Sequence, residues 1–396
     1  MRVTERAQRI EPFYVMEVAK AAHLLAQDLA GHDWPMLMLN IGEPDFTAAP
    51  LVQDAAQAAI QSGQTQYTPA TGLIALRHAI SNWYQQRFGL RIDAERIIVT
   101  AGASGALQLA CLTLIESGDE ILMPDPSYPC NRHFVSAANG HATLLPTTHH
   151  DRYQLSPEQV AQNWKPGTRG VLLASPSNPT GTSIALSALK AIHERVQHQG
   201  GITLVDEIYL GLTFDEELSQ SALAIDERVI SINSFSKYFC MTGWRLGWMV
   251  APKTLVPSLE RLAQNLFICP STVAQHAALA CFEPESLAIF EERRLAFKAR
   301  RDYLVPALEA LGFGVPLSPD GAFYIWSDCR GLYDKLGVTN SWDFTFELMK
   351  RAHVALAPGR DFGRHETEHF VRWSIASALP ELKEAVRRIQ HVLDNA

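Results

Sequence analysis

A lysine, two serines and an arginine lie close together in SINSFSKYFCMTGWRLGW, residues 231–248. Ser234, Ser236 and Lys237 directly follow an apolar run, and Arg245 comes eight residues after the lysine. A lysine at the end of a buried strand loses hydration, which favours the neutral amine that forms an imine with a carbonyl group. Hydroxyls and a guanidinium beside it suit a phosphate group. A lone lysine after a strand is more often a solvated surface residue, so this spacing alone does not decide.

A second segment offers backbone groups to an anion. In VTAGASGAL (99–107) we expect a strand to break at Gly102 and a helix to begin near Ser104. The first N–H groups of a helix have no partner within it, and together with the helix dipole they attract an anion. The same residues would also form an ordinary tight turn between a strand and a helix.

Two further segments end apolar runs with groups that suit a ring. In ITLVDEIY (202–209) Asp206 ends the run and Tyr209 follows within one turn. A buried carboxylate needs a cationic partner, and a protonated ring nitrogen would serve. In SPSNPTG (175–181) Asn178 stands between turn residues and would supply an amide, although alone it indicates only a turn.

Three patterns of other enzymes are incomplete. HETEH (365–369) matches the zinc-protease pattern H-E-x-x-H, which requires a helix; here it follows Gly363 and precedes an apolar strand, so we expect a polar surface loop and no metal. LVDE resembles the acidic strand end of nucleotide hydrolases, but the sequence has no Gly-Lys dipeptide. Ser234 to Lys237 reads S-x-x-K without the other penicillin-recognition motifs.

Short apolar runs that alternate with helix-length segments must position these groups. Most runs are apolar on both faces, which is typical of strands in a mostly parallel sheet that helices cover, and the carboxyl ends of such strands bind ligands. We therefore expect an α/β domain over residues 47–285. Its predicted strands are 97–100, 120–124, 142–146, 170–175, 202–207, 229–234 and 245–252.

The two ends of the chain differ from this core. Apolar residues spaced three and four apart predict a helix over 14–30 that Gly31 stops, so residues 1–46 form an N-terminal arm and part of a small domain. Residues 286–396 predict a smaller α+β domain. Its predicted elements are a charged helix at about 285–311, strands 322–327, 354–358 and 369–376, and a last helix from about 380.

Composition excludes several classes of function. The 396 residues include 34 Lys and Arg against 42 Asp and Glu, a formal charge of −8, which argues against nucleic acid or an anionic membrane as a partner. The uncharged stretch 97–115 is long enough to span a bilayer, but its Gly-Ala-Ser-Gly predicts a strand, a turn and a helix instead. The six cysteines lack paired spacing and the first ten residues have no apolar core, so we expect a reducing, cytoplasmic setting.

Taken together, an amine, a phosphate clamp, an acid for a ring nitrogen and an amide for a phenolic oxygen complement pyridoxal 5′-phosphate. The chain resembles the class I and II aminotransferases of fold type I over nearly its whole length and in the order of that family. The motifs that carry the resemblance are GEPDF (42–46), YTPATGLIALR (67–77), DPSYP (125–129), SPSNPTG, DEIY, SFSKYFCMTGWRLGW, DGAFY (320–324), APGRDFG (357–363) and VRWSIA (371–376).

The resemblance implies a role for each matching residue. Lys237 would form the imine with the cofactor and later move the substrate proton, and Asp206 would keep the ring nitrogen protonated. The remaining cofactor contacts would come from Asn178 and Tyr209 at the phenolic oxygen, Tyr128 on the ring face, and Ser234, Arg245 and the amides of Gly102, Ala103 and Ser104 at the phosphate. Arg372 would hold the substrate carboxylate, with Asn178 beside it and Gly42 giving the backbone room.

The resemblance also implies a homodimer with shared active sites, in which Tyr67 reaches the phosphate of the partner subunit. We expect transfer of an α-amino group to a 2-oxo acid. Dicarboxylate-specific members of the most similar subgroup tend to carry a lysine at the position of Ser104 and a hydroxyl near that of Val15, so an apolar or aromatic amino acid is favoured.

Two alternatives remain open. A carbon–sulfur lyase or a decarboxylase shares these motifs, because the cofactor stabilises a carbanion that several reactions use. A non-enzymatic regulator would place a DNA-binding domain before the fold, but GEPDF begins at residue 42, and such a protein would be expected to lose Lys237 or Asp206.

Overall fold

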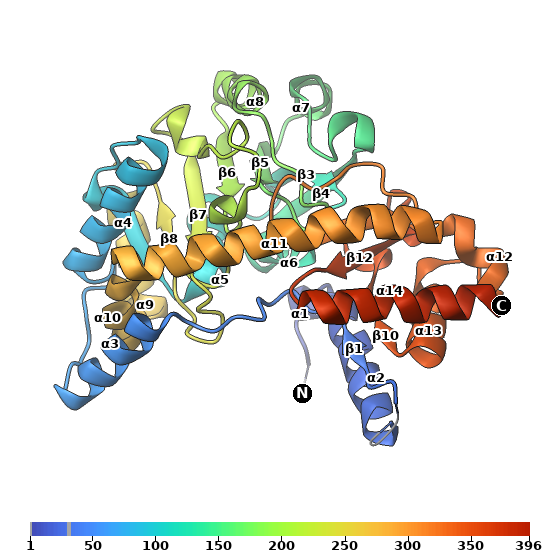
Figure 1. Ribbon diagram of the computed structural model, residues 1–396. Helices are drawn as coiled ribbons and strands as arrows, with labels where there is room; N and C mark the ends of the chain where they lie inside the picture. The colour runs from blue at the N-terminus through green and yellow to red at the C-terminus, as the bar shows by residue number, and fades with distance from the viewer. Residues whose placement is uncertain (1, 30–32) are drawn as a thin grey trace.

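A seven-stranded sheet forms the centre of the computed structural model, which describes residues 2–29 and 33–396 (Figure 1). The strand order is β2-β8-β7-β6-β5-β3-β4, and all pairs are parallel except the two that β8 makes. The strands are β2 (Ile97–Thr100), β3 (Glu120–Asp125), β4 (His141–Pro146), β5 (Thr168–Ala174), β6 (Ile202–Asp206), β7 (Ile230–Ser234) and β8 (Gly247–Val250). The predicted α/β architecture is confirmed.

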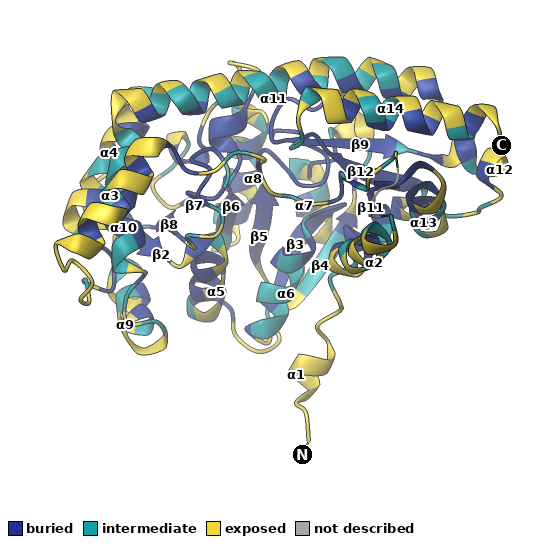
Figure 2. Ribbon diagram, turned by 60° about the horizontal axis from the view of Figure 1, so that its bottom comes forward, coloured by how far each residue is buried: buried dark blue, intermediate teal, exposed yellow. Residues whose placement is uncertain are grey.

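Helices cover both faces of this sheet, and Figure 2 shows the buried strands between helices whose outer faces are exposed. Because side chains alternate along a strand, one strand contributes to two cores. In β5, Leu172 packs into the core that includes α5, whereas Val171 and Leu173 pack into the core that includes α8. The helices around the sheet are α3 (Pro50–Gln61), α4 (Ile74–Phe88), α5 (Gly102–Leu114), α6 (Pro129–Ala137), α7 (Pro157–Asn163), α8 (Leu186–His198), α9 (Val256–Leu266) and α10 (Thr272–Leu279).

A smaller α+β region surrounds a three-stranded antiparallel sheet, β11-β12-β9. The long helix α11 runs from the large sheet to this region and packs beside the last helix, α14 (Figure 1). The elements are β9 (Tyr324–Asp328), β10 (Val354–Ala355), β11 (Ala357–Pro358), β12 (Phe370–Ser374), α11 (Pro284–Leu311), α12 (Tyr333–Leu336), α13 (Ser341–Ala352) and α14 (Leu379–Asp394). The domain boundaries after residues 46 and 285 stay a prediction.

The N-terminal arm packs against the small region. It contains α1 (Glu5–Gln8), α2 (Tyr14–Asp28) and β1 (Leu37–Met38), and β1 pairs in parallel with β10. Val18 and Ala22 of α2 are buried against Met349 and Ala355. The predicted stop of α2 at Gly31 lies outside the described residues.

The structure corrects several predicted details. Helix α5 begins at Gly102 and not near Ser104, because Gly102 has φ of +74° and makes the turn itself. The strand expected at 354–358 is divided into β10 and β11, and β9 starts two residues later than expected. At the sheet edge, β4 is partly exposed and not buried on both sides.

Neither the uncharged stretch 97–115 nor the HETEH segment forms the structure that its pattern could suggest, a membrane span or a zinc-binding helix. Residues 97–115 form β2 and α5, and within residues 2–29 and 33–396 no helix is long and apolar enough to cross a membrane. HETEH is an irregular turn that ends in the short 3₁₀ helix Thr367–His369 before β12. The two histidines of HETEH therefore lack the α-helix that the zinc pattern requires.

Candidate active site

Two connected cavities, each of about 390 Å³, lie at the carboxyl ends of β6 and β7. They share Gly42, Tyr128, Asp206 and Lys237 in their walls. The first cavity continues to Ala103, Ser104, Ser234 and Arg245, and the second to Asn178, Tyr209 and Arg372. All the site residues predicted from the sequence except Gly102 and Tyr67 therefore line these cavities; Gly102 adjoins Arg245, and Tyr67 is 81% exposed on the surface.

Lys237 follows β7 and points its amine into the shared part of the cavities. Its Nζ donates a hydrogen bond to the carbonyl oxygen of Gly42 at 2.6 Å. Burial lowers the pKa of Lys237 to about 8, and Arg372 and Arg245 add repulsion that Glu43 and Asp206 partly offset. About a tenth of the amine is therefore neutral at pH 7, far more than for a solvated lysine, and the neutral form is the one that attacks a carbonyl.

Asp206 is a buried carboxylate, only 4% exposed, at the end of β6. Its oxygens accept two long hydrogen bonds, from the Ile208 N–H at 3.3 Å and from Asn131 Nδ2 at 3.4 Å. Burial raises the pKa of Asp206 to about 6, and these hydrogen bonds and the charge of Lys237 only partly oppose the shift. A cation placed against this carboxylate would stabilise its ionised form and lower its pKa again.

Close backbone contact brings Arg245 to the start of α5. A Cβ atom on Gly247 would lie 2.8 Å from the Ala103 nitrogen, and one on Gly102 would lie 2.7 Å from Arg245 Nη2. The hydroxyl of Ser234, which the Ser236 N–H approaches at 3.0 Å, faces the same cavity. Guanidinium, hydroxyl and helix N-terminus thus surround one space of the kind that binds a phosphate group.

Arg372 is a buried arginine, 2% exposed, on β12. Its Nη1 donates to Asn178 Oδ1 at 2.9 Å, and its Nη2 donates to the Asn40 carbonyl oxygen at 2.6 Å. The guanidinium lies 4.3 Å from the centre of the Tyr324 ring. Its Nε is buried without a hydrogen-bond partner among the described residues, and Nη1 and Nη2 each carry a second N–H that can donate to a ligand in the cavity.

Tyr209 and Tyr324 join the two sides of the site. Their hydroxyl groups lie 2.8 Å apart in a hydrogen bond. A Cβ on Gly42 would come within 2.4 Å of the Tyr324 hydroxyl, so only glycine fits at that position. Tyr324 therefore contacts Tyr209, which is predicted to bind the cofactor, and Arg372, which is predicted to bind the substrate carboxylate.

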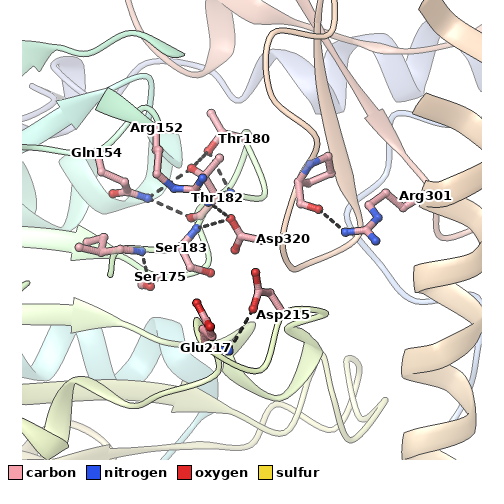
Figure 3. Close-up of polar contacts among 12 residues, drawn as sticks. Arg152, Gln154, Ser175, Thr180, Thr182, Ser183, Asp215, Glu217, Arg301 and Asp320 are labelled. Carbon is pink, nitrogen blue, oxygen red and sulfur yellow. Dashed lines mark hydrogen bonds and ion pairs between the residues drawn. The ribbon is translucent and has the colours of Figure 1, made fainter. Parts of the chain in front are cut away.

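Residues that flank Asn178 in the sequence, Ser175, Thr180, Thr182 and Ser183, take part in the polar network in Figure 3. The carboxylate of Asp320 accepts hydrogen bonds from Arg152 and from the Ser183 N–H. Gln154 Nε2 donates to the carbonyl oxygens of Ala174 and Thr182 at 3.2 and 3.0 Å. This network stabilises the segment around Asn178, and the hydrogen bond from Arg372 orients the Asn178 amide.

Comparison with known proteins assigns this arrangement to a family. The sequence profile of the family described as "Aminotransferase class I and II" matches residues 35–389. The chain belongs to the class I and II aminotransferases. It is thus an aminotransferase, a transferase of amino groups, and members of this family use pyridoxal phosphate.

Three similar proteins illustrate the range of this aminotransferase family. A valine–pyruvate aminotransferase from Mycobacterium tuberculosis is 35% identical and aligns over 98% of this chain and 97% of its own. An aspartate aminotransferase from Geobacillus stearothermophilus is 31% identical over 100% and 99% of the two chains. The crystal structure of an aminotransferase from Mycobacterium tuberculosis superposes with a TM-score of 0.93 at 35% identity, covering 100% of both chains.

Sequence reasoning missed several residues that the structure brings to the aminotransferase site. Asn131 stands three residues after Tyr128, one helical turn away, so its spacing carried a signal. Tyr324 ends the DGAFY motif, yet its motif gave no reason to expect contact with Tyr209. The Asn40 carbonyl oxygen is a backbone group, which no sequence pattern distinguishes.

Proposed function

We propose that this aminotransferase binds pyridoxal 5′-phosphate in the shared cavities and moves the α-amino group of an apolar L-amino acid to a 2-oxo acid. One observation carries the proposal: a single cavity is lined by the amine of Lys237, the carboxylate of Asp206 and the guanidinium of Arg372, and its remaining wall is mostly apolar.

The residues present fit the cofactor. Asp206 is buried, and its hydrogen bonds come from the neutral groups of Asn131 and Ile208, so a protonated ring nitrogen would supply the missing charge. The space between Arg245, Ser234 and the start of α5 suits the phosphate, and Asn178 and Tyr209 present polar groups for the phenolic oxygen. When bound, pyridoxal phosphate withdraws electrons from the substrate Cα.

The residues of the chain perform the remaining work. Arg372 orients the α-carboxylate of the amino acid through its guanidinium, which Tyr324 and Asn178 hold in place. Lys237, with its lowered pKa, attaches the cofactor and then moves the proton from the substrate Cα. Asp206 holds a proton on the ring nitrogen. The apolar wall limits the access of water to these groups.

The second cavity favours an apolar side chain. Its apolar wall includes the side chains of Phe13, Val15, Met16, Ala19 and Ile41. The cations in the wall are Lys237 and Arg372, both already assigned, and Glu43 would repel a second carboxylate. The similarity to a valine–pyruvate aminotransferase supports an apolar substrate. Aspartate aminotransferases are also among the relatives, so membership of the family does not by itself identify the substrate.

We propose in addition that two copies of the chain share their active sites. Tyr67 is 81% exposed, while its neighbours are anchored: the Gln66 carbonyl oxygen accepts from Thr272 and the Thr68 hydroxyl from Gln275. The loop thus presents an aromatic ring outward on a fixed backbone. Mixing Lys237→Ala chains with Tyr67→Ala chains tests this proposal, since hybrid dimers with shared sites regain activity and hybrid dimers with separate sites do not.

A panel of amino acids tests the activity. Single-turnover absorbance changes of the loaded protein should be fast with valine, leucine and phenylalanine and slow with aspartate and glutamate, and pyruvate should restore the original spectrum. Release of thiol or carbon dioxide without formation of a new amino acid would instead identify a lyase or decarboxylase. Fast turnover of aspartate would refute the apolar assignment.

A further inference from the structure

Arg132 lies on α6, outside both cavities, yet it joins three parts of the molecule. Its Nη2 donates to Glu11 Oε2 at 3.3 Å and to the Asp361 carbonyl oxygen at 3.2 Å. Glu11 belongs to the N-terminal arm, and Asp361 precedes the loop that leads to β12. The side chain of Arg132 is 14% exposed and that of Glu11 is 43% exposed, so the contact with Asp361 is partly buried, whereas the ion pair with Glu11 is open to solvent.

Asp361 continues the connection into the substrate cavity. Its fully buried carboxylate accepts from the Tyr14 N–H at 3.2 Å and from the Val15 N–H at 2.9 Å. These are the first residues of α2, whose N-terminal N–H groups have no partner within the helix. Burial raises the pKa of Asp361 to about 6, and the charges of Arg372 and Arg132 oppose the shift.

Arm residues that follow this anchor form the apolar wall. Phe13, Val15 and Met16 line the same cavity as Arg372, and the ring of Phe13 meets that of Tyr128 edge-on at 6.2 Å. Val15 is buried, whereas Met16 is 61% exposed, so part of this wall is open to solvent. Arg132 therefore contacts both Glu11, which precedes residues 13–16 in the sequence, and Asp361, which binds the backbone of that segment. Residues 13–16 are the ones that would contact a substrate side chain.

We propose that Arg132 is a positioning residue for substrate selection: it clasps the arm against Asp361 and so keeps the apolar wall closed over the amino-acid side chain. The proposal rests on the proposed function, in which this wall receives an apolar side chain. An amino acid with a large side chain gains from the closed wall, whereas alanine barely reaches it. Arg132 thus affects the preference for large over small substrates without touching either.

Arg132→Gln tests the proposal, because glutamine keeps a polar side chain but loses the charge and the reach of the guanidinium. KM for valine should rise about tenfold, the equivalent of one lost hydrogen bond to a charged group, while KM for alanine changes less than about twofold. The affinity for pyridoxal phosphate should stay the same. Arg132→Lys keeps the charge and should restore part of the preference for valine.

Arg364→Gln is the matched control. Arg364 also faces Glu11, but at 3.7 Å and with a side chain that is 84% exposed, so its removal should leave the valine-to-alanine ratio unchanged. An unchanged ratio in Arg132→Gln, or an equal change in the Arg364→Gln control, would overturn the proposal.

Limited proteolysis separates this proposal from the proposed function. Lys20 is exposed but lies within α2, so trypsin cuts there only when the helix unfolds locally. Release of the arm from Arg132 would favour this unfolding, and cutting of the cofactor-free Arg132→Gln protein should therefore be faster than that of wild type. This result requires no catalysis. If wild type transaminates no amino acid, the proposed function fails while the arm contact can still be confirmed; if cutting at Lys20 is unchanged, the clasp is refuted.

Discussion

Replacement of Arg372 by lysine distinguishes substrate binding from cofactor binding. Lysine keeps a positive charge but has a single nitrogen, so it cannot donate to Asn178 and Asn40 and at the same time bind a carboxylate with two parallel hydrogen bonds. The ammonium also loses the close contact of the guanidinium with the Tyr324 ring. The substrate carboxylate is therefore expected to lose at least one well-positioned charged hydrogen bond.

The magnitude follows from that lost contact. A hydrogen bond to a charged group contributes about 1.5–3 kcal/mol, and about 1.4 kcal/mol corresponds to a factor of ten. We therefore expect kcat/KM for valine to fall about 10- to 100-fold in Arg372→Lys. The dissociation constant of pyridoxal phosphate should stay within about twofold of wild type, because the predicted phosphate contacts lie in the other cavity.

The assay compares single-turnover rates over a range of valine concentrations with a titration of the cofactor-free protein by pyridoxal phosphate. Arg388→Lys is the matched control: Arg388 is 2% exposed and donates to the Pro35 carbonyl oxygen at 2.6 Å, but it lies on α14 and lines neither cavity. It should lower stability and leave kcat/KM unchanged. Equal losses of cofactor affinity and kcat/KM in Arg372→Lys would refute the role of its guanidinium.

Three further predictions follow from the site. In Asp206→Asn, transamination should fall by orders of magnitude with cofactor bound, and unchanged turnover would contradict the role of Asp206. The cofactor-free variant should be more stable than wild type in urea above about pH 6. At that pH the wild-type carboxylate is ionised although burial raises its pKa, and this costs stability that asparagine does not lose. The rate at which cofactor-free protein captures pyridoxal phosphate should rise with pH and level off above about 8, the lowered pKa of Lys237, and a continued rise toward 10.5 would mean that the amine is solvated. In Gly102→Ala, whose φ is +74° and whose new Cβ would crowd Arg245, the cofactor dissociation constant measured by titration should rise about tenfold, and an unchanged constant would show that the phosphate binds elsewhere.

Much of the large sheet could be predicted because its strands are apolar on both faces and end at turn residues. The prediction was less accurate where an element depends on contacts with distant parts of the chain, because a local sequence pattern does not show which segment it will contact. Helix α5 starts at Gly102, where the backbone turns with a positive φ angle. The residue types of the Gly-Ala-Ser-Gly segment do not show at which residue this turn occurs. The division of residues 354–358 arises because β10 pairs with the arm and β11 with β12, two partners far apart in sequence.

The site could be predicted where a motif states a residue type and its place at a strand end, as for Lys237 and Asp206. It could not be predicted where contact depends on how two regions of the chain pack. Tyr324 meets Tyr209 only because β9 lies across from the end of β6, and Arg132 meets Glu11 only because the arm folds over α6. Such contacts between distant segments leave no periodic pattern in either segment.

Borohydride reduction of the cofactor-loaded protein tests the central claim most directly. The loaded protein should be yellow, and reduction should abolish the colour and fix the mass of reduced pyridoxal phosphate to the single tryptic peptide that contains Lys237. Lys237→Ala protein, treated in the same way, should carry no label. Labelling of Lys237→Ala, or labelling of wild type at another lysine, would contradict the assignment of Lys237 and the proposed site with it.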